Sequence, residues 1–125
     1  MKSNYTWLLI IIFCTALFLR FFKLGEIPHG LYQDETAIGY NAYSLLLTGR
    51  DEHNRPYPLY FKSFGDWKLP TYIYLTTASV QLFGLNEFAV RFPSALFGVL
   101  SVIILFFYIR QISKNPTLAI LTSGL

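Results

Sequence analysis

The chain has 125 residues, of which 54% are hydrophobic, 18% aromatic and only 14% charged. Soluble domains carry about 25% charged residues, so this composition indicates a membrane protein. The net charge is +3, and all seven acidic residues lie between Glu26 and Glu87. The segments on either side carry cations and no acid. This distribution indicates a polar loop between membrane segments and excludes a nucleic-acid-binding surface.

The first apolar segment is predicted to form a transmembrane helix over residues 6–22. Residues Ser3–Leu19 carry no charge. Extended to Phe22, the segment reaches the length of about 17–25 residues that a spanning helix needs. Tyr5 can lie at one interface, and Arg20 can snorkel to the other. No small-residue cleavage pattern follows, so we expect an uncleaved membrane anchor and not a signal peptide.

Two more apolar segments follow in the C-terminal part of the chain. A second transmembrane helix is predicted over 91–110, because the eighteen residues Phe92–Ile109 carry no charge. A third span is predicted to start within 117–125, which is too short to cross the membrane by itself. We therefore expect the chain to be the N-terminal part of a larger, multi-spanning protein.

Residues 24–90 are predicted to form an extracytoplasmic loop with two interfacial helices, near 34–48 and 69–83. The second of these is apolar, but its fifteen residues give only roughly 22 Å of helix, and polar residues interrupt it. If it lies flat on the membrane, Lys2, Arg110 and Lys114 share the cytoplasmic side, as the positive-inside rule prefers. If it spans the membrane, Arg110 and Lys114 lie on the outer side instead.

Residues that end helices or form turns divide this loop. Gly49 is a good stop for the first helix, and Pro70 is allowed in the first turn of the second. Between them, Leu59–Phe64 is predicted to be extended, and Gly65-Asp66 to form a turn. The cluster Asp51-Glu52-His53 is a weak metal signal, because consecutive residues rarely point at one ion. We interpret it as a solvated turn.

Asp34 and Glu35 are adjacent carboxylates at the start of the predicted helix. In the structural interpretation, Asp34 caps the helix and Glu35 interacts with the positive end of its dipole. In the functional interpretation, the pair supplies a general base or a metal ligand beside the membrane. Both can hold together, since one acid can cap while the other reacts.

Lys68 and Arg91 are the cations that bracket the second predicted interfacial helix. Each can be a membrane-anchoring side chain at an interface. Each can also bind a lipid phosphate, Lys68 as a point charge and Arg91 through its forked guanidinium. A divalent metal is possible in such a site, and no cofactor is indicated. No phosphate-binding glycine loop or dinucleotide fingerprint is present.

An ordered set of motifs resembles a known family of membrane enzymes. The set comprises Arg20-x-x-x-Leu24, Asp34-Glu35, Gly65-Asp-Trp-Lys68-Leu-Pro70-Thr-Tyr, Leu82-Phe-Gly84 and Glu87-Phe-Ala-Val-Arg91-Phe-Pro-Ser94-Ala-Leu-Phe-Gly98. It is similar to the N-terminal region of GT-C glycosyltransferases that use polyprenyl-phosphate sugars. The nearest members are bacterial relatives of the protein O-mannosyltransferases and the lipid A aminoarabinose transferases.

The resemblance implies an all-α membrane protein of the GT-C fold, with two complete transmembrane helices, interfacial helices in the first outer loop, and the start of a third span. It implies that Asp34 is the catalytic acid, with Glu35 as its neighbour, and that Lys68 and Arg91 bind the donor phosphate. Trp67 departs from the aminoarabinose transferases, which tend to have an acid there. This departure argues against a metal site of their kind.

The implied reaction is an inverting transfer of a sugar from a polyprenyl-phosphate donor to a protein, lipid or glycan acceptor outside the cytoplasm. The implied location is a bacterial plasma membrane, with membrane lipid and no nucleic acid as partners. We expect the isolated fragment to be inactive, because much of the donor site would come from further helices. The alternatives are a non-catalytic membrane anchor or assembly module and a transporter segment. A transporter predicts charges inside the spans, and the cores of both spans carry none.

Overall fold

The computed structural model describes the backbone of residues 3–124 and the side chains of residues 6–124. Lys2 and Leu125, which entered the predicted topology, lie outside the described residues, as does the side chain of Tyr5. Seven elements follow in chain order. They are α1 (Ser3–Phe21), α2 (Gln33–Thr48), β1 (Phe61–Ser63), β2 (Asp66–Lys68), α3 (Pro70–Phe83), α4 (Glu87–Ser113) and α5 (Pro116–Ser123).

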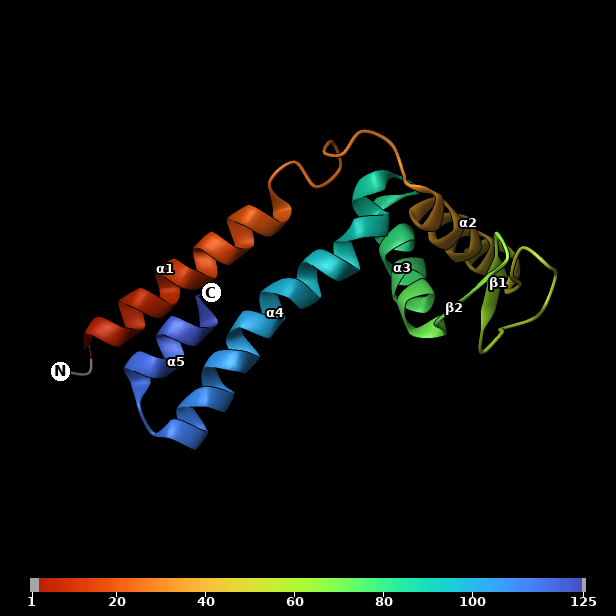
Figure 1. Ribbon diagram of the computed structural model, residues 1–125. Helices are drawn as coiled ribbons and strands as arrows, with labels where there is room; N and C mark the ends of the chain where they lie inside the picture. Colours follow the sequence, from red (N-terminus) through yellow and green to blue (C-terminus); the bar gives the residue numbers. More distant parts are fainter. Residues whose placement is uncertain (1–2, 125) are drawn as a thin grey trace. The chain divides into compact units, whose positions relative to one another are not determined.

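The helices of the described chain form two compact units (Figure 1). The loop unit comprises residues 23–93 and contains α2, the two strands, α3 and the first turns of α4. The helical unit comprises the described residues of 1–22 and 94–125, with α1, the remainder of α4 and α5. Helices α2 and α3 lie within one residue of the ranges 34–48 and 69–83 at which helices are predicted, and their place at the membrane interface stays a prediction.

The core of the loop unit lies between α2 and α3. Helix α3 buries Ile73, Thr76 and Val80, which lie on one face at helical spacing. Against them pack the buried residues Ala42 and Leu45 of α2. The expected stops are also present: Gly49 ends α2 at a φ of 68°, and Pro70 opens α3.

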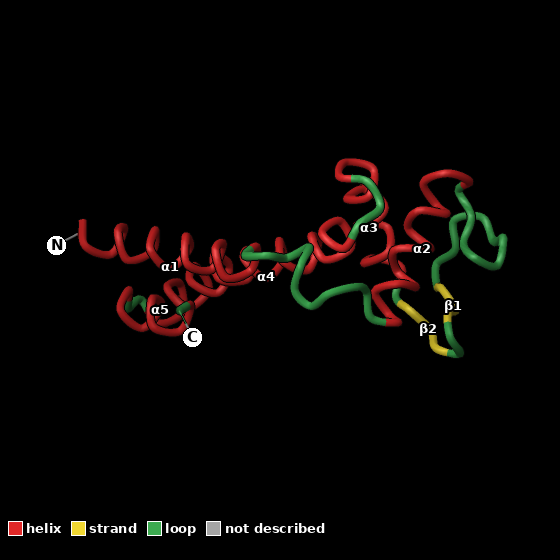
Figure 2. The backbone as a smooth tube through the Cα atoms, turned by 90° about the horizontal axis from the view of Figure 1, so that it is seen from above, coloured by secondary structure: helices red, strands yellow, loops and turns green. Residues whose placement is uncertain are grey.

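The described chain is mostly helical, as expected, and the strands β1 and β2 add one short antiparallel hairpin beside α2 (Figure 2). Ser63 pairs with Asp66, so the connection has only two residues, Phe64 and Gly65. Both have positive φ, 53° and 81°, as a tight hairpin turn of the right twist requires. The turn therefore lies one residue earlier than predicted, and Asp66 belongs to β2.

The helical unit packs α5 against α1 and α4. Its small core joins Phe106 of α4 to Ala119 and Ile120 of α5, with Leu9 and Ile12 of α1 packed against it. Asn115 begins α5 by accepting hydrogen bonds from the backbone N–H groups of Thr117 and Leu118.

Among the described residues, α4 is the one helix that is long and apolar enough to cross a membrane by length and composition. The predicted span 91–110 lies within it, so the helix continues beyond the span at both ends. Residues Thr6–Phe21 of α1 form a shorter apolar helix. Two complete spans, and a flat position for α3 on the membrane, stay predictions.

Candidate active site

Asp34 and Lys68 form an ion pair within the loop unit. The Lys68 Nζ lies 2.6 Å from Asp34 Oδ1, which is the distance of a strong charge-assisted hydrogen bond. The Asp34 side chain is 61% exposed, whereas that of Lys68 is only 12% exposed. The pair therefore combines an accessible carboxylate with a lysine side chain that protein mostly covers.

The hairpin positions Lys68 for this contact. Lys68 is the last residue of β2 and pairs across the ladder with Phe61, whose side chain is fully buried in the loop-unit core. Side chains alternate along a strand, so Lys68 and Asp66 lie on the same face of β2. The Asp66 carboxylate is 3.7 Å from the Lys68 Nζ. Lys68 thus lies between two carboxylates.

These contacts fix the charge of Lys68. The hydrogen bond that Lys68 donates to Asp34 raises the pKa of the Lys68 ammonium above its ordinary value, burial partly offsets this rise, and the Asp66 charge raises the pKa further. Lys68 is therefore a permanent cation at physiological pH. A cation held between two carboxylates is suited to bind another anionic group, such as a phosphate. The phosphate would contact Lys68 in place of one carboxylate or together with it.

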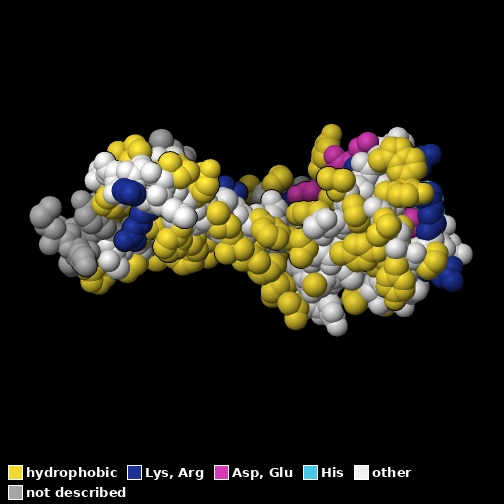
Figure 3. Space-filling model, turned by 90° about the horizontal axis from the view of Figure 1, so that it is seen from below, with side chains coloured by type: hydrophobic (Ala, Val, Ile, Leu, Met, Phe, Trp, Pro, Cys, Tyr) yellow, Lys and Arg dark blue, Asp and Glu magenta, His cyan; other side chains and the backbone are white. Residues whose placement is uncertain are grey.

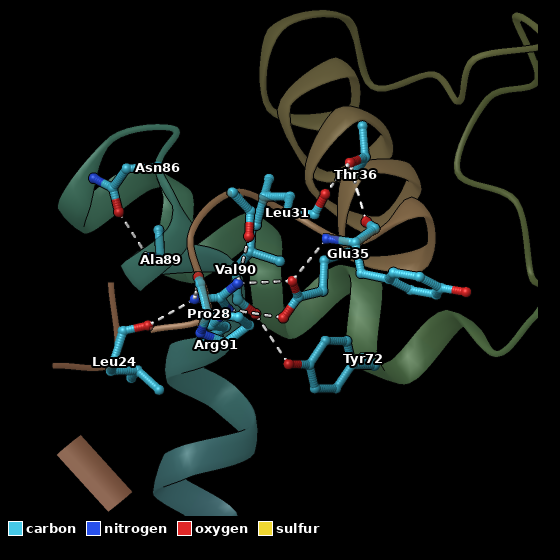
Figure 4. Close-up of polar contacts among 12 residues, drawn as sticks. Leu24, Pro28, Leu31, Glu35, Thr36, Tyr72, Asn86, Ala89, Val90 and Arg91 are labelled. Atoms are coloured by element: carbon cyan, nitrogen blue, oxygen red, sulfur yellow. Dashed lines mark hydrogen bonds and ion pairs between the residues drawn. The ribbon is translucent and has the colours of Figure 1, made fainter. Parts of the chain in front are cut away.

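Glu35 and Arg91 form a second pair, separate from the first (Figure 4). Arg91 Nε donates to Glu35 Oε1 at 2.8 Å, and its Nη2 donates to Glu35 Oε2 at 2.9 Å. This is the forked geometry that arginine makes with a carboxylate. The hydrogen bond from Arg91 lowers the pKa of Glu35, more than burial raises it, and a bond from the backbone N–H of Tyr32 adds to the lowering.

Arg91 uses its remaining N–H groups to hold the segment that leads into α2. Nη1 donates to the carbonyls of Leu24 and Pro28 at 3.1 Å each, and Nη2 donates to the carbonyl of Gly30 at 2.7 Å. With the two bonds to Glu35, all five N–H donors of the guanidinium are engaged. A phosphate contact by Arg91, as predicted, requires at least one of these bonds to open.

The start of α2 corrects the capping interpretation of Asp34. The helix is capped at Tyr32, and it is Glu35 whose carboxylate accepts the Tyr32 backbone N–H, at 3.1 Å. Asp34 lies in the first turn with its side chain turned to Lys68. The two adjacent acids therefore differ: Glu35 serves the local structure, and Asp34 is left accessible.

The Asp51 cluster is solvated in part, as expected, since Glu52 and His53 are exposed, but Asp51 itself is buried. Asp51 is 4% exposed, and its Oδ1 accepts the backbone N–H groups of His53 and Arg55. Its neighbour Glu52 accepts a hydrogen bond from the buried Ser63 hydroxyl. These residues organise the connection between α2 and β1. Nothing in the local sequence pattern indicates that Asp51 is buried while its two neighbours are exposed.

Metal-ligand side chains do not gather in the part of the chain that the structure describes. No group of three or more His, Cys, Asp or Glu side chains is placed there to hold an ion. The arrangement around Asp34 offers one lysine and two carboxylates instead.

Comparison with known proteins gives one match. Residues 68–125 match the family model described as dolichyl-phosphate-mannose-protein mannosyltransferase. The matched range contains Lys68 and Arg91 and begins after Asp34 and Glu35. No curated protein and no solved structure matches the chain.

Proposed function

Because residues 68–125 are mannosyltransferase-like and of the GT-C type, we propose that the protein transfers a sugar from a polyprenyl-phosphate donor, at a site built on Asp34 and Lys68. The match itself indicates a membrane glycosyltransferase in general. The observation that carries the proposal is the 2.6 Å contact between the Lys68 ammonium and the Asp34 carboxylate. It joins a cation for the leaving phosphate to an accessible carboxylate that can act as a base.

In the proposed reaction, the donor lies with its lipid chain in the bilayer and its phosphate beside Lys68. The Asp34 carboxylate takes the proton from the acceptor hydroxyl, and the acceptor oxygen attacks the anomeric carbon. The bond from that carbon to the phosphate oxygen breaks, and its electron pair leaves with the phosphate. Attack from the face opposite the phosphate inverts the anomeric configuration. Lys68 stabilises the negative charge that grows on the leaving oxygen.

Glu35 and Arg91 hold Asp34 in place in this account. Glu35 is one residue from Asp34, and Arg91 fixes Glu35 in the first turn of α2. Arg91 also holds the segment that leads into α2, by donating hydrogen bonds to three of its carbonyl groups. Both residues therefore act on the reaction through the position of Asp34. The phosphate role predicted for Arg91 remains part of the proposal, for a state in which one of its bonds has opened.

The location and acceptor belong to the same proposal. The site faces the extracytoplasmic side of a bacterial plasma membrane in a multi-pass protein, and the acceptor is a protein, lipid or glycan. The support is the predicted topology, in which the polar loop lies opposite the cytoplasmic cations Arg110 and Lys114.

The experiment compares Lys68→Gln with Lys23→Gln in the protein in its native membrane. Lys23 also forms an ion pair, with Glu26 at 3.2 Å, but both partners of this pair are exposed and neither is a residue of the proposed site. Loss of a charge-assisted bond to phosphate costs about 1.5–3 kcal/mol, so we expect kcat/KM for the donor to fall roughly 10–100-fold in Lys68→Gln. Lys23→Gln should match the unsubstituted protein. An unchanged donor dependence in Lys68→Gln contradicts the phosphate role.

A further inference from the structure

The hairpin has a second surface, on the face opposite Lys68. We call it the hairpin outer face and define it by Arg55, Tyr60, Lys62 and Trp67. Lys62 pairs directly with Trp67 across the ladder, and Phe61 pairs with Lys68. Because strand side chains alternate, the first pair points away from the core and from Asp34. The outer face is therefore separate from the candidate active site.

Its four side chains form a preassembled cluster of two rings and two cations. The Tyr60 and Trp67 rings meet edge to face with centroids 5.1 Å apart. The Lys62 Nζ lies 5.7 Å from the centroid of the Trp67 ring, and the Arg55 Cζ lies 5.6 Å from that of the Tyr60 ring. Both cation–ring distances are within the range of attraction.

The cluster is exposed and has an apolar border. Trp67 is 58% and Tyr60 53% exposed, and exposed apolar side chains flank them along the hairpin, namely Leu59, Phe64 and Leu69. Figure 3 shows dark-blue cationic side chains beside yellow hydrophobic ones at this end of the loop unit. The combination of aromatic, aliphatic and cationic side chains is unusual for a surface that faces bulk water.

In the part of the chain that the structure describes, no ion pair joins Arg55 or Lys62 of the outer face to an acid. Asp66 contacts the Lys68 ammonium and the backbone N–H of Trp67. Glu52 accepts the hydroxyl of Ser63, which lies on the inner face. Neither acid forms an ion pair with Arg55 or Lys62, so the two cations of the cluster are available to an anionic partner.

We propose that the hairpin outer face docks on the surface of a bilayer that contains anionic lipid. Tyrosine and tryptophan favour the boundary between headgroups and hydrocarbon, and lysine and arginine attract lipid phosphates there. The competing occupant for exposed aromatic rings is a sugar stacked on a ring face. Here a cation already lies over each ring, which disfavours stacking and favours headgroup contact. The inference requires a membrane beside the loop but does not depend on sugar transfer.

The chain offers a direct probe, because it has two tryptophans, Trp7 and Trp67. The experiment uses the Trp7→Phe chain, so that emission reports the hairpin alone, in vesicles of phosphatidylcholine with or without phosphatidylglycerol. Brominated acyl chains quench a tryptophan only when it reaches the boundary region. We expect Trp67 to be quenched by brominated lipid in vesicles that contain phosphatidylglycerol, and less in phosphatidylcholine alone or in high salt.

A charge variant separates docking from mere proximity. Arg55→Gln with Lys62→Gln removes both cations, and each cation near an anionic surface favours docking about fivefold. We expect the ratio of docked to undocked hairpin to fall about 25-fold in vesicles with phosphatidylglycerol. The control exchanges Lys23 and Lys114 for glutamine, which alters the total charge equally and should leave quenching unchanged.

Three results overturn the proposal. The first is a Trp67 that is quenched by iodide in the water and not by brominated lipid in either vesicle. The second is lipid quenching that is the same in both vesicle types and in the charge variant, since it would show that cations do not direct docking. The third is protection from iodide that grows with the protein-to-lipid ratio without lipid quenching, which would assign the surface to a second copy of the chain.

Discussion

At the scale of single residues, the two adjacent acids of α2 have different partners. Glu35 is enclosed by Arg91 and the Tyr32 backbone, and Asp34 reaches Lys68. The identities of these acids were evident from the sequence, but their partners were not. Lys68 is 34 residues from Asp34, and the register of a hairpin brings the two together. Glu35 and Arg91 are 56 residues apart, and nothing local predicts that all five N–H groups of the arginine are used.

The Arg91 pair gives the first prediction. Arg91→Ala leaves Glu35 and three carbonyls of the loop unit without their donor. We expect the free energy of unfolding to fall by about 3 kcal/mol, the lower end of the range for a buried ion pair, because Glu35 is partly exposed. Arg91→Lys should recover only part of this, since an ammonium cannot form the fork. Thermal unfolding in detergent measures the stability of both variants. Equal unfolding midpoints for Arg91→Lys and the unsubstituted protein would contradict the forked geometry.

Glu35 gives a prediction about pH. Its pKa in the folded protein is lowered, chiefly by Arg91, from an ordinary value of 4.5. The resulting stabilisation is therefore fully present above about pH 4.5 and is lost as the pH falls through the lower folded value. We expect Glu35→Gln to lower the unfolding midpoint at pH 6 and to differ less from the native protein at pH 3.5. A difference that grows on acidification would contradict this sign.

At the scale of elements, glycines and prolines made the helix ends predictable. Gly49 and Pro70 end α2 and begin α3 where the sequence predicts, because their backbone preferences act locally. The hairpin was harder to predict. Its strands have only three residues each. Its turn has a positive φ at Phe64, and phenylalanine is not a residue type that indicates such a conformation. The extended segment was therefore predicted without its partner strand.

Gly49 provides the test at this scale. Its φ of 68° costs other residues about 1–2 kcal/mol, and an added Cβ would lie 2.8 Å from the Tyr57 hydroxyl oxygen. Gly49→Ala should therefore destabilise the loop unit by more than the backbone cost alone. The control is Gly65→Ala, where φ is 81° but no atom lies within 4 Å of the added Cβ. Thermal unfolding followed by circular dichroism compares the two variants. An equal loss of stability in both would show that the Tyr57 side chain moves aside at no energetic cost.

At the scale of the whole molecule, composition indicated a membrane protein, and residues 68–125 match a family of membrane glycosyltransferases. The number of spans and the side of the membrane that the loop faces depend on the charge pattern alone. If α3 lies flat, Asp34 and Gln81 face the same side. With Cys14 exchanged for serine, cysteines placed at 34 and at 81 should both react with an impermeant maleimide from outside intact cells. Labelling of one position only would show that α3 spans the membrane.

The central claim is that Asp34 is the base of a sugar transfer. The most direct measurement is the rate of transfer from a radiolabelled polyprenyl-phosphate sugar by Asp34→Asn in the protein in its native membrane, with Glu26→Gln as control. Glu26 is an exposed acid paired with Lys23. General-base catalysis contributes about 10²–10⁴-fold, so Asp34→Asn should lose transfer by that factor while it remains inserted and Glu26→Gln stays active. Near-normal transfer by Asp34→Asn would contradict the account.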